Sequence, residues 1–268
     1  MYFSIEGTDY WYEVTGEGTP IVLLHGFTGT SATWESLIKT EAPGIQFITI
    51  DMPGHGKTKG NRLVTMDEFS RDLKGLLDYL NLKKIYLVGY SMGGRAALNF
   101  AAQHPERLFG LALESASPGL TTEEERTQRK EADEKLIQRI ETEGITSFVD
   151  FWQSIALFDT QKSLSEEVQN NIREERLSQR ESGLVESLRG MGTGAQNSNW
   201  EKLFDLTFPV LLIVGNLDGK FVAINEQMSE WLPNATMEIF IDAGHAVHVE
   251  KPVLFNECIL GFANYHTS

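Results

Sequence analysis

One segment, Lys84–Gln103, constrains the fold of this chain more than any other; it reads KIYLVGYSMGGRAALNFAAQ. The apolar run from Ile85 to Val88 predicts one buried strand, and the alanine-rich run from Arg95 predicts a helix. Between them lies Gly89-Tyr90-Ser91-Met92-Gly93-Gly94, a G-x-S-x-G motif in a strand–turn–helix context. Such a turn is tight, so we expect the glycines at 89 and 93 to leave room where strand and helix approach.

The serine of this motif is the candidate nucleophile. A tight turn holds Ser91 in a strained backbone conformation that lifts its hydroxyl above the sheet edge. A helix beginning at Met92 directs its unpaired N–H groups and its positive dipole end to the same place. We therefore predict a catalytic serine. The alternative is a glycine-rich helix start in which Ser91 only caps the helix.

The other apolar runs predict an α/β fold with a mostly parallel central sheet flanked by helices. A short antiparallel hairpin is expected over Tyr2–Glu6 and Tyr10–Thr15 at the sheet edge. Further strands are expected at Ile21–Leu24, Phe47–Ile50, Leu108–Leu113, Val210–Val214 and Met237–Ile241, with a last helix from Val253 to Tyr265. Alternation of strands with helices requires crossover connections, which make neighbouring strands parallel.

The pattern changes over residues 119–200, which are charge-rich, helical in period and without a convincing strand. We expect residues 1–118 and 201–268 to form the core and residues 119–200 to form an inserted helical lid. For 268 residues, one domain with an insertion is more natural than two domains. A separate helical domain is the alternative, but no linker sets this region apart.

Charge and cysteine content exclude several classes of function. The net charge of −15 disfavours binding to nucleic acid and to anionic membrane surfaces. No apolar run approaches transmembrane length, and the first residues form no signal sequence. The single cysteine, Cys258, cannot form an internal disulfide. We expect a cytoplasmic protein without membrane insertion, as a monomer or weak homo-oligomer acting on a small molecule.

Ser91, Asp218 and His245 each follow a predicted strand, and carboxyl ends of parallel strands share one sheet edge. Their order along the chain is that of the α/β-hydrolase family. His245 can take the proton of the Ser91 hydroxyl, while Asp218 fixes the imidazole tautomer. The alternatives are that Asp218 only forms a turn and that His245 is an ordinary loop histidine. Glu114, also at a strand end, is a second candidate for the acid.

An oxyanion hole is expected from the N–H of Met92 and that of Phe27, in the loop His25-Gly26-Phe27. Phe27 can also be an apolar wall of the pocket. His248 and Glu250 follow His245 closely and could suggest a metal site. No second cluster of metal ligands supports such a site, so we interpret His248 as structural and expect no metal.

Arg95 lies four residues after Ser91, so a helix places it on the same face, near the site. Burial of an arginine requires a partner. One possibility is an internal salt bridge, and the other is bidentate binding of an anionic substrate. Its position alone leaves both open.

The stretch Gly89–Arg95 resembles the nucleophile motif of the 2-succinyl-6-hydroxy-2,4-cyclohexadiene-1-carboxylate synthase family, and the similarity covers nearly the whole chain. Further matching stretches are His25–Gly29, Asp51–Gly56, Glu114–Leu120, Ser187–Gln196 and Asp218–Phe221. General hydrolases share the glycine and triad motifs but not the stretches at 187–196 and 218–221, which are therefore the most specific.

The resemblance implies an α/β-hydrolase fold and a lyase of menaquinone biosynthesis that eliminates pyruvate from a cyclohexene carrying several carboxylates. It implies no metal and no organic cofactor. It also implies that Ser91, activated by His245, acts as the base. The substrate-binding residues that it implies are Tyr90, Arg95, Arg129, Trp152, Arg176 and Lys220, with Arg126, Arg173 and Arg180 competing for the two lid arginine positions. The arginines would form a basic pocket inside an acidic protein.

Two other functions remain open from the sequence. The same scaffold supports an esterase or carbon–carbon bond hydrolase, which has no need of several arginines in its pocket. It also supports a non-catalytic protein that binds a small ligand.

Overall fold

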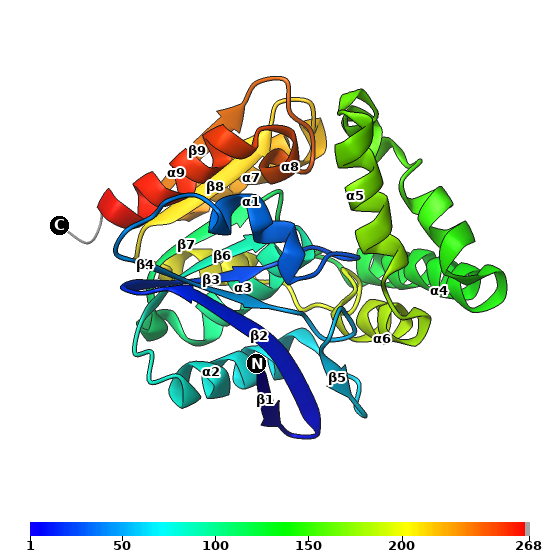
Figure 1. The fold of residues 1–268 in the computed structure, drawn as a ribbon, viewed down its shortest axis with the longest axis horizontal. Helices are drawn as coiled ribbons and strands as arrows, with labels where there is room; N and C mark the ends of the chain where they lie inside the picture. The colour runs from blue at the N-terminus through cyan, green and yellow to red at the C-terminus, as the bar shows by residue number, and fades with distance from the viewer. Residues whose placement is uncertain (266–268) are drawn as a thin grey trace.

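The computed structural model describes residues 1–265 and contains one nine-stranded sheet beside a group of inserted helices (Figure 1). The sheet order is β1-β2-β4-β3-β6-β7-β8-β9, and a short strand β5 pairs with β2. The strands are β1 (Tyr2–Ile5), β2 (Thr8–Gly16), β3 (Thr19–Leu24), β4 (Ile45–Ile50), β5 (Lys59–Gly60), β6 (Ile85–Tyr90), β7 (Leu108–Glu114), β8 (Val210–Gly215) and β9 (Ala235–Phe240). In this sheet order, all neighbours from β4 onward pair in parallel. Strand β2 pairs antiparallel with β4 and with β5, and it forms the antiparallel hairpin with β1. The predicted fold class is confirmed.

Two hydrophobic layers cover the sheet, because alternate residues of a strand point to opposite faces. Val22 and Leu24 of β3 pack into one layer, and Ile21 and Leu23 pack into the other. The first layer is completed by α2 (Met66–Tyr79), α3 (Met92–Gln103) and α7 (Gly219–Trp231). The second is completed by α1 (Glu35–Ile38), α8 (Val247–Glu250) and α9 (Pro252–Tyr265). Burial on both faces explains why these strands are continuously apolar.

The turn between β6 and α3 is as tight as its glycines predict. A Cβ atom at Gly89 would overlap the carbonyl oxygen of Gly93, and a Cβ atom at Gly93 would overlap that of Leu24 at the end of β3. Ser91, between them, has φ 51° and ψ −107°, an uncommon conformation for a residue with a side chain. The packing of α3 against the strand ends therefore fixes the backbone of Ser91.

Between β7 and β8 the chain forms α4 (Glu123–Trp152), α5 (Glu166–Leu177) and α6 (Glu181–Met191), with no strand in the described part of this insertion (Figure 1). Thr122 and Glu125 form a capping box at the start of α4, and Gly144, at φ 79°, breaks that helix. The insertion has its own apolar cluster, made by Ile137, Ile140, Phe148, Val149, Leu184, Val185 and Leu188. Phe27 of the core also packs against this cluster, so the two parts meet at that side chain.

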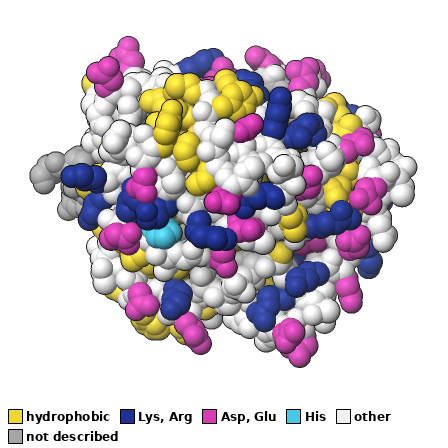
Figure 2. Space-filling model, turned by 90° about the horizontal axis from the view of Figure 1, so that it is seen from below, with side chains coloured by type: hydrophobic (Ala, Val, Ile, Leu, Met, Phe, Trp, Pro, Cys, Tyr) yellow, Lys and Arg dark blue, Asp and Glu magenta, His cyan; other side chains and the backbone are white. Residues whose placement is uncertain are grey.

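The face of the protein drawn in Figure 2 carries side chains of both charges. Figure 2 shows acidic and basic side chains interspersed over the visible face rather than segregated into one field. Within residues 1–265, no helix combines the length and the apolar character needed to cross a bilayer.

The tight turn generates a stability prediction. Gly93→Ala should lower the free energy of unfolding by about 1–3 kcal/mol, because the added methyl group must displace backbone at the end of β3. The matched control is Gly261→Ala in α9, where a Cβ meets nothing within 4 Å. There alanine should raise the stability by up to about 1 kcal/mol through helix propensity. Urea titration checks both, and equal effects of the two variants would contradict the packing argument.

Candidate active site

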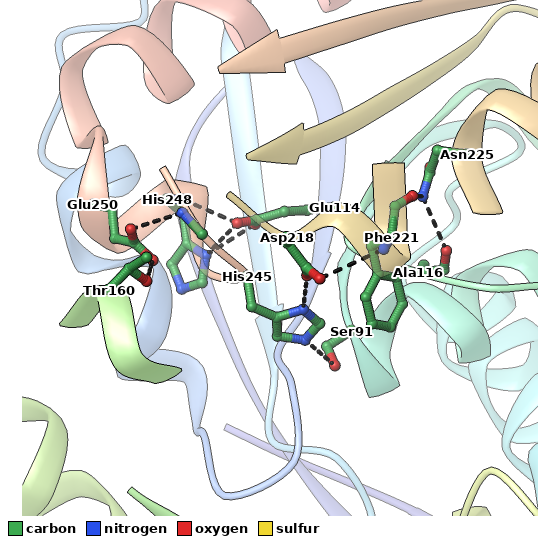
Figure 3. Close-up of polar contacts among 11 residues, drawn as sticks. Ser91, Glu114, Ala116, Thr160, Asp218, Phe221, Asn225, His245, His248 and Glu250 are labelled. Atoms are coloured by element: carbon green, nitrogen blue, oxygen red, sulfur yellow. Dashed lines mark hydrogen bonds and ion pairs between the residues drawn. The ribbon is translucent and has the colours of Figure 1, made fainter. Parts of the chain in front are cut away.

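Three side chains at the carboxyl ends of β6, β8 and β9 form a hydrogen-bonded chain (Figure 3). His245 Nε2 lies 3.0 Å from Ser91 Oγ, and His245 Nδ1 lies 2.7 Å from Asp218 Oδ2. A carboxylate only accepts hydrogen bonds, so Nδ1 carries the proton and Nε2 is left to accept from the Ser91 hydroxyl. The second Asp218 oxygen accepts from the Phe221 N–H at 3.4 Å. The structure thus joins Ser91, His245 and Asp218 in the geometry of a general base and its nucleophile.

The second candidate acid, Glu114, bonds to a different histidine. Its fully buried carboxylate accepts from the backbone N–H of His248 at 3.0 Å and from His248 Nδ1 at 2.9 Å (Figure 3). Glu250 instead accepts from the Gly244 N–H at 2.8 Å and from the Thr160 hydroxyl at 2.9 Å. Nowhere in residues 1–265 do three or more His, Cys, Asp or Glu side chains gather as a metal site.

The amides expected to form the oxyanion hole belong to Met92, the first residue of α3, and Phe27, in the loop after β3. Two buried histidines hold that loop. His25 accepts from the Met52 N–H through Nε2 and donates to the Gly26 carbonyl. His55 accepts from the Thr28 N–H and donates to a backbone carbonyl of its own loop.

Both of these histidines are neutral at pH 7. Burial lowers the pKa of His25 to about 4 and that of His55 to about 3. Each ring therefore keeps one donor and one acceptor nitrogen, as its two backbone contacts require.

A cavity of about 900 Å³ opens beside Ser91 and His245. Five of the six substrate-binding residues implied by the resemblance line it, namely Tyr90, Arg95, Arg129, Trp152 and Lys220. Arg176 is not among the lining residues; its guanidinium stacks on the Phe158 ring and donates to Gln161 at 3.3 Å. Phe27 and Met92 also line the cavity, so Phe27 is both a wall and the carrier of a candidate amide.

Arg95 is a buried cation that makes no ion pair within residues 1–265, although the buried Asp133 acts on it electrostatically. It is 9% exposed and donates to the neutral Gln196 side chain at 2.9 Å, and no carboxylate oxygen within residues 1–265 lies within 4 Å of it. Burial and the nearby charge of Arg129 lower the pKa of Arg95 to about 9, which leaves it protonated at pH 7. Of the two possibilities that its position left open, the internal salt bridge is not formed with any residue of the described range 1–265.

The other cations of the insertion are already paired or lie away from the cavity. Arg129 bonds to Asp133 at 2.8 Å, although it still lines the cavity. Among the three competing arginines, Arg126 and Arg180 donate to backbone carbonyls, and Arg173 pairs with Asp150. None of these three lines the cavity.

One further group at the cavity was not singled out from the sequence. Ser115, directly after β7, lines the cavity, and its buried hydroxyl has no hydrogen-bond partner in the described part of the chain. Trp152, expected from the resemblance, also has a buried, unpaired indole N–H. The location of Ser115 after a strand was the available signal, since the same edge carries the triad.

Comparison with known proteins identifies the family of this chain. A family described as alpha/beta hydrolase fold matches residues 19–252. The putative 2-succinyl-6-hydroxy-2,4-cyclohexadiene-1-carboxylate synthase of Bacillus subtilis is 43% identical over 259 residues, covering 94% of each chain. The structure of MenH from S. aureus is similar with a TM-score of 0.91 and 33% identity, over 98% of this chain and 100% of that one. A Thermogutta terrifontis esterase, solved with malate bound, has a TM-score of 0.88 and 25% identity over 100% of both chains.

The extent of these matches decides the family. The synthase relatives align with almost the whole chain at more than 30% identity. The chain belongs to the 2-succinyl-6-hydroxy-2,4-cyclohexadiene-1-carboxylate synthase family, a family of enzymes built on the α/β-hydrolase fold.

Proposed function

We propose that this enzyme eliminates pyruvate from 2-succinyl-5-enolpyruvyl-6-hydroxy-3-cyclohexene-1-carboxylate and releases 2-succinyl-6-hydroxy-2,4-cyclohexadiene-1-carboxylate, in menaquinone biosynthesis. The observation that carries the proposal is the buried Arg95 without a carboxylate partner, in the same cavity as Ser91 and His245. The names of the relatives support it. We place the reaction in the cytoplasm, because a lone cysteine suits a reducing compartment.

The proposed reaction begins with removal of a proton from the substrate. In the proposed mechanism, Ser91 removes the acidic proton next to the succinyl ketone and passes its own hydroxyl proton to His245 Nε2, 3.0 Å away. Asp218, bonded to Nδ1, stabilises the imidazolium that forms. The electrons move through the ring and break the bond to the enolpyruvyl oxygen. The leaving group then takes a proton and becomes pyruvate, so that water is not consumed.

The negative charge moves to the ketone oxygen as the proton leaves. The Met92 and Phe27 amides are the proposed donors to this enolate oxygen, and the N-terminus of α3 adds its positive dipole end. These donors are held before the reaction begins, since the turn fixes Met92 and the two neutral histidines fix the Phe27 loop. Little reorganisation is then needed when charge develops.

The carboxylates of the substrate would bind to the cavity cations. Arg95 and Lys220 have no ion-pair partner within the described part of the chain, and Arg129 shares its charge with Asp133. The Trp152 N–H is a further free donor. We propose that residues 119–200 act as the lid over this cavity and that Arg176 contributes from behind Phe158.

An esterase acting on a carboxylated substrate is the second candidate. The specific observation in its favour is the similar structure of an esterase that was solved with malate, a dicarboxylate. The same triad and oxyanion hole would serve an acyl-enzyme.

The first prediction concerns the base. Ser91→Ala and His245→Ala should each lower kcat by roughly 10³-fold or more, because each removes one end of the proton-transfer pair. Thermal unfolding should change little, since neither side chain is part of the apolar core. Stopped-assay kinetics of pyruvate release measure the effect. Near-normal turnover by Ser91→Ala would rule out the mechanism.

A second prediction separates substrate binding from stability. Arg95→Ala should reduce productive binding of the anionic substrate by about 2–5 kcal/mol, seen in kcat/KM. Arg95→Lys should recover only part of it, because an ammonium cannot bind bidentately.

Arg107→Ala is the matched control for Arg95. Arg107 is also 9% exposed, but it bonds to the Leu82 and Lys83 carbonyls and to Asp78. Its loss should lower the melting temperature and leave kcat/KM intact. If Arg95→Ala behaved in the same way as Arg107→Ala, Arg95 would be structural.

The third prediction decides between elimination and hydrolysis. With the cyclohexene substrate, pyruvate should appear one-for-one with the ultraviolet absorbance of the diene. In ¹⁸O-labelled water the chemical step should introduce no label, whereas an acyl-enzyme would place solvent oxygen in the product. Simple aryl esters should react slowly or not at all. Fast ester cleavage without pyruvate release would replace the lyase with the esterase.

A further inference from the structure

The inserted helices hold the loop that carries Phe27 through two side chains that the mechanism above does not use. We propose that Gln179 and Glu175, at the end of α5, are positioning residues that hold residues 28–30 and so orient the Phe27 N–H toward the developing negative charge. This inference rests on the proposed role of the Ser91 site and assigns a second task to the insertion.

Gln179 forms hydrogen bonds both to the loop after β3 and to the loop after β4 that contains Gly56. It is 5% exposed, and its Nε2 lies 3.3 Å from both the Thr28 and the Gly29 carbonyl oxygens. The same nitrogen reaches the Glu175 carbonyl at 3.3 Å, and Oε1 accepts from the Gly56 N–H at 3.1 Å. Within residues 1–265, no other group donates to the Thr28 and Gly29 carbonyls.

Glu175 holds the next part of the loop. Its Oε1 accepts from the Thr30 N–H and the Thr30 hydroxyl, both at 2.8 Å, and from the Thr33 hydroxyl at 3.0 Å. Glu175 lies in the last turn of α5 and Gln179 follows two residues after the helix ends, and both side chains reach the same loop. The carboxylate has no ion-pair partner within the described residues, so these three hydrogen bonds are its specific contacts.

The loop needs this support because its backbone is unusual. Thr28 has φ 71°, in the left-handed region that residues with side chains rarely occupy. The Phe27 N–H belongs to the Gly26–Phe27 peptide, and only the φ and ψ of Phe27 separate that peptide from the Thr28 backbone. A shift of Thr28 is therefore transmitted to the Phe27 amide through a single residue. From the core side the loop is held through the Thr28 N–H by His55 and through the Gly29 N–H by Gly26. Its outward-facing carbonyls depend on the insertion.

The expected loss of rate can be estimated from the effect of displacing a catalytic group. A shift of about 1 Å in a catalytic group can lower a rate by roughly 10²-fold. Loss of the Gln179 contacts should therefore lower kcat by about ten- to a hundredfold. KM should change by less than about twofold, because the cavity cations keep their positions. A side chain that only stabilised the insertion would not produce this separation of kcat from KM.

The test uses four variants of the full-length enzyme. Gln179→Met keeps the length of the side chain but removes the amide, and Glu175→Ala removes the acceptor. Glu175→Gln keeps an oxygen that can accept from the same donors and should retain most of the activity. Gln169→Met is the matched control, because Gln169 lies on α5 and donates to the Lys162 and Leu164 carbonyls inside the insertion.

Two rates are measured for each variant. One is turnover of the cyclohexene substrate. The other is the reaction of Ser91 with a fluorophosphonate probe, which depends on the triad and oxyanion hole but not on the natural substrate. In that reaction the Ser91 Oγ–P bond forms, the P–F bond breaks, fluoride leaves and His245 takes the serine proton, while the phosphoryl oxygen occupies the oxyanion hole.

We expect Gln179→Met and Glu175→Ala to slow both rates about ten- to a hundredfold, with Glu175→Gln and Gln169→Met close to the wild type. Wild-type rates in Gln179→Met and Glu175→Ala, with unchanged circular dichroism, would overturn the proposal. Equal rate losses in Gln169→Met and Gln179→Met would also overturn it. Should Gln179→Met not fold, the comparison of Glu175→Ala with Glu175→Gln decides the question in the same way.

The two readouts keep this inference separate from the proposed reaction. If the probe reacts slowly with the two loop variants but the cyclohexene releases no pyruvate in the wild type, the reaction is wrong and the positioning role stands. If the wild type and Gln179→Met release pyruvate equally fast, the positioning role is wrong and the reaction stands.

Discussion

The close packing of α3 against the ends of β3 and β6 is the constraint on which the rest of the site depends. Side chains at Gly89 or Gly93 would overlap backbone oxygens, so only glycine lets the helix begin this near the sheet. That approach sets the strained φ of Ser91 and brings the Met92 amide to the site where charge is proposed to develop. One steric condition thus positions the candidate nucleophile, one oxyanion donor and the helix dipole together.

Charge in this protein has to be understood locally. The net charge of −15 would repel a polycarboxylate at long range, but screening limits that repulsion to about 8–10 Å in physiological salt. Inside the cavity the nearest charges dominate, and these include Arg95, which is buried, bonds to the neutral Gln196 and makes no ion pair within residues 1–265. An unpaired buried cation costs stability. Its presence beside Ser91 is most simply understood as preparation for an anion.

Sequence reasoning succeeded where local patterns determine structure. Continuous apolar runs located the strands to within a few residues, and the chain order Ser91, Asp218, His245 located three side chains that the structure brings together. Chain order favoured Asp218 as the partner of His245, but Glu114 stayed open as a second candidate because it also follows a strand. The choice depends on which histidine each carboxylate meets in three dimensions, and Glu114 meets His248.

The arginines and loop contacts of the insertion were the least predictable part, because they join residues far apart in the chain. Gln179 reaches Thr28, and Thr160 reaches Glu250, whose other oxygen accepts from the N–H of Gly244 beside His245. The insertion therefore touches the loops after both β3 and β9, which carry the Phe27 amide and the candidate base. Because of these contacts, a movement of the insertion would also displace the loops that carry the Phe27 amide and His245.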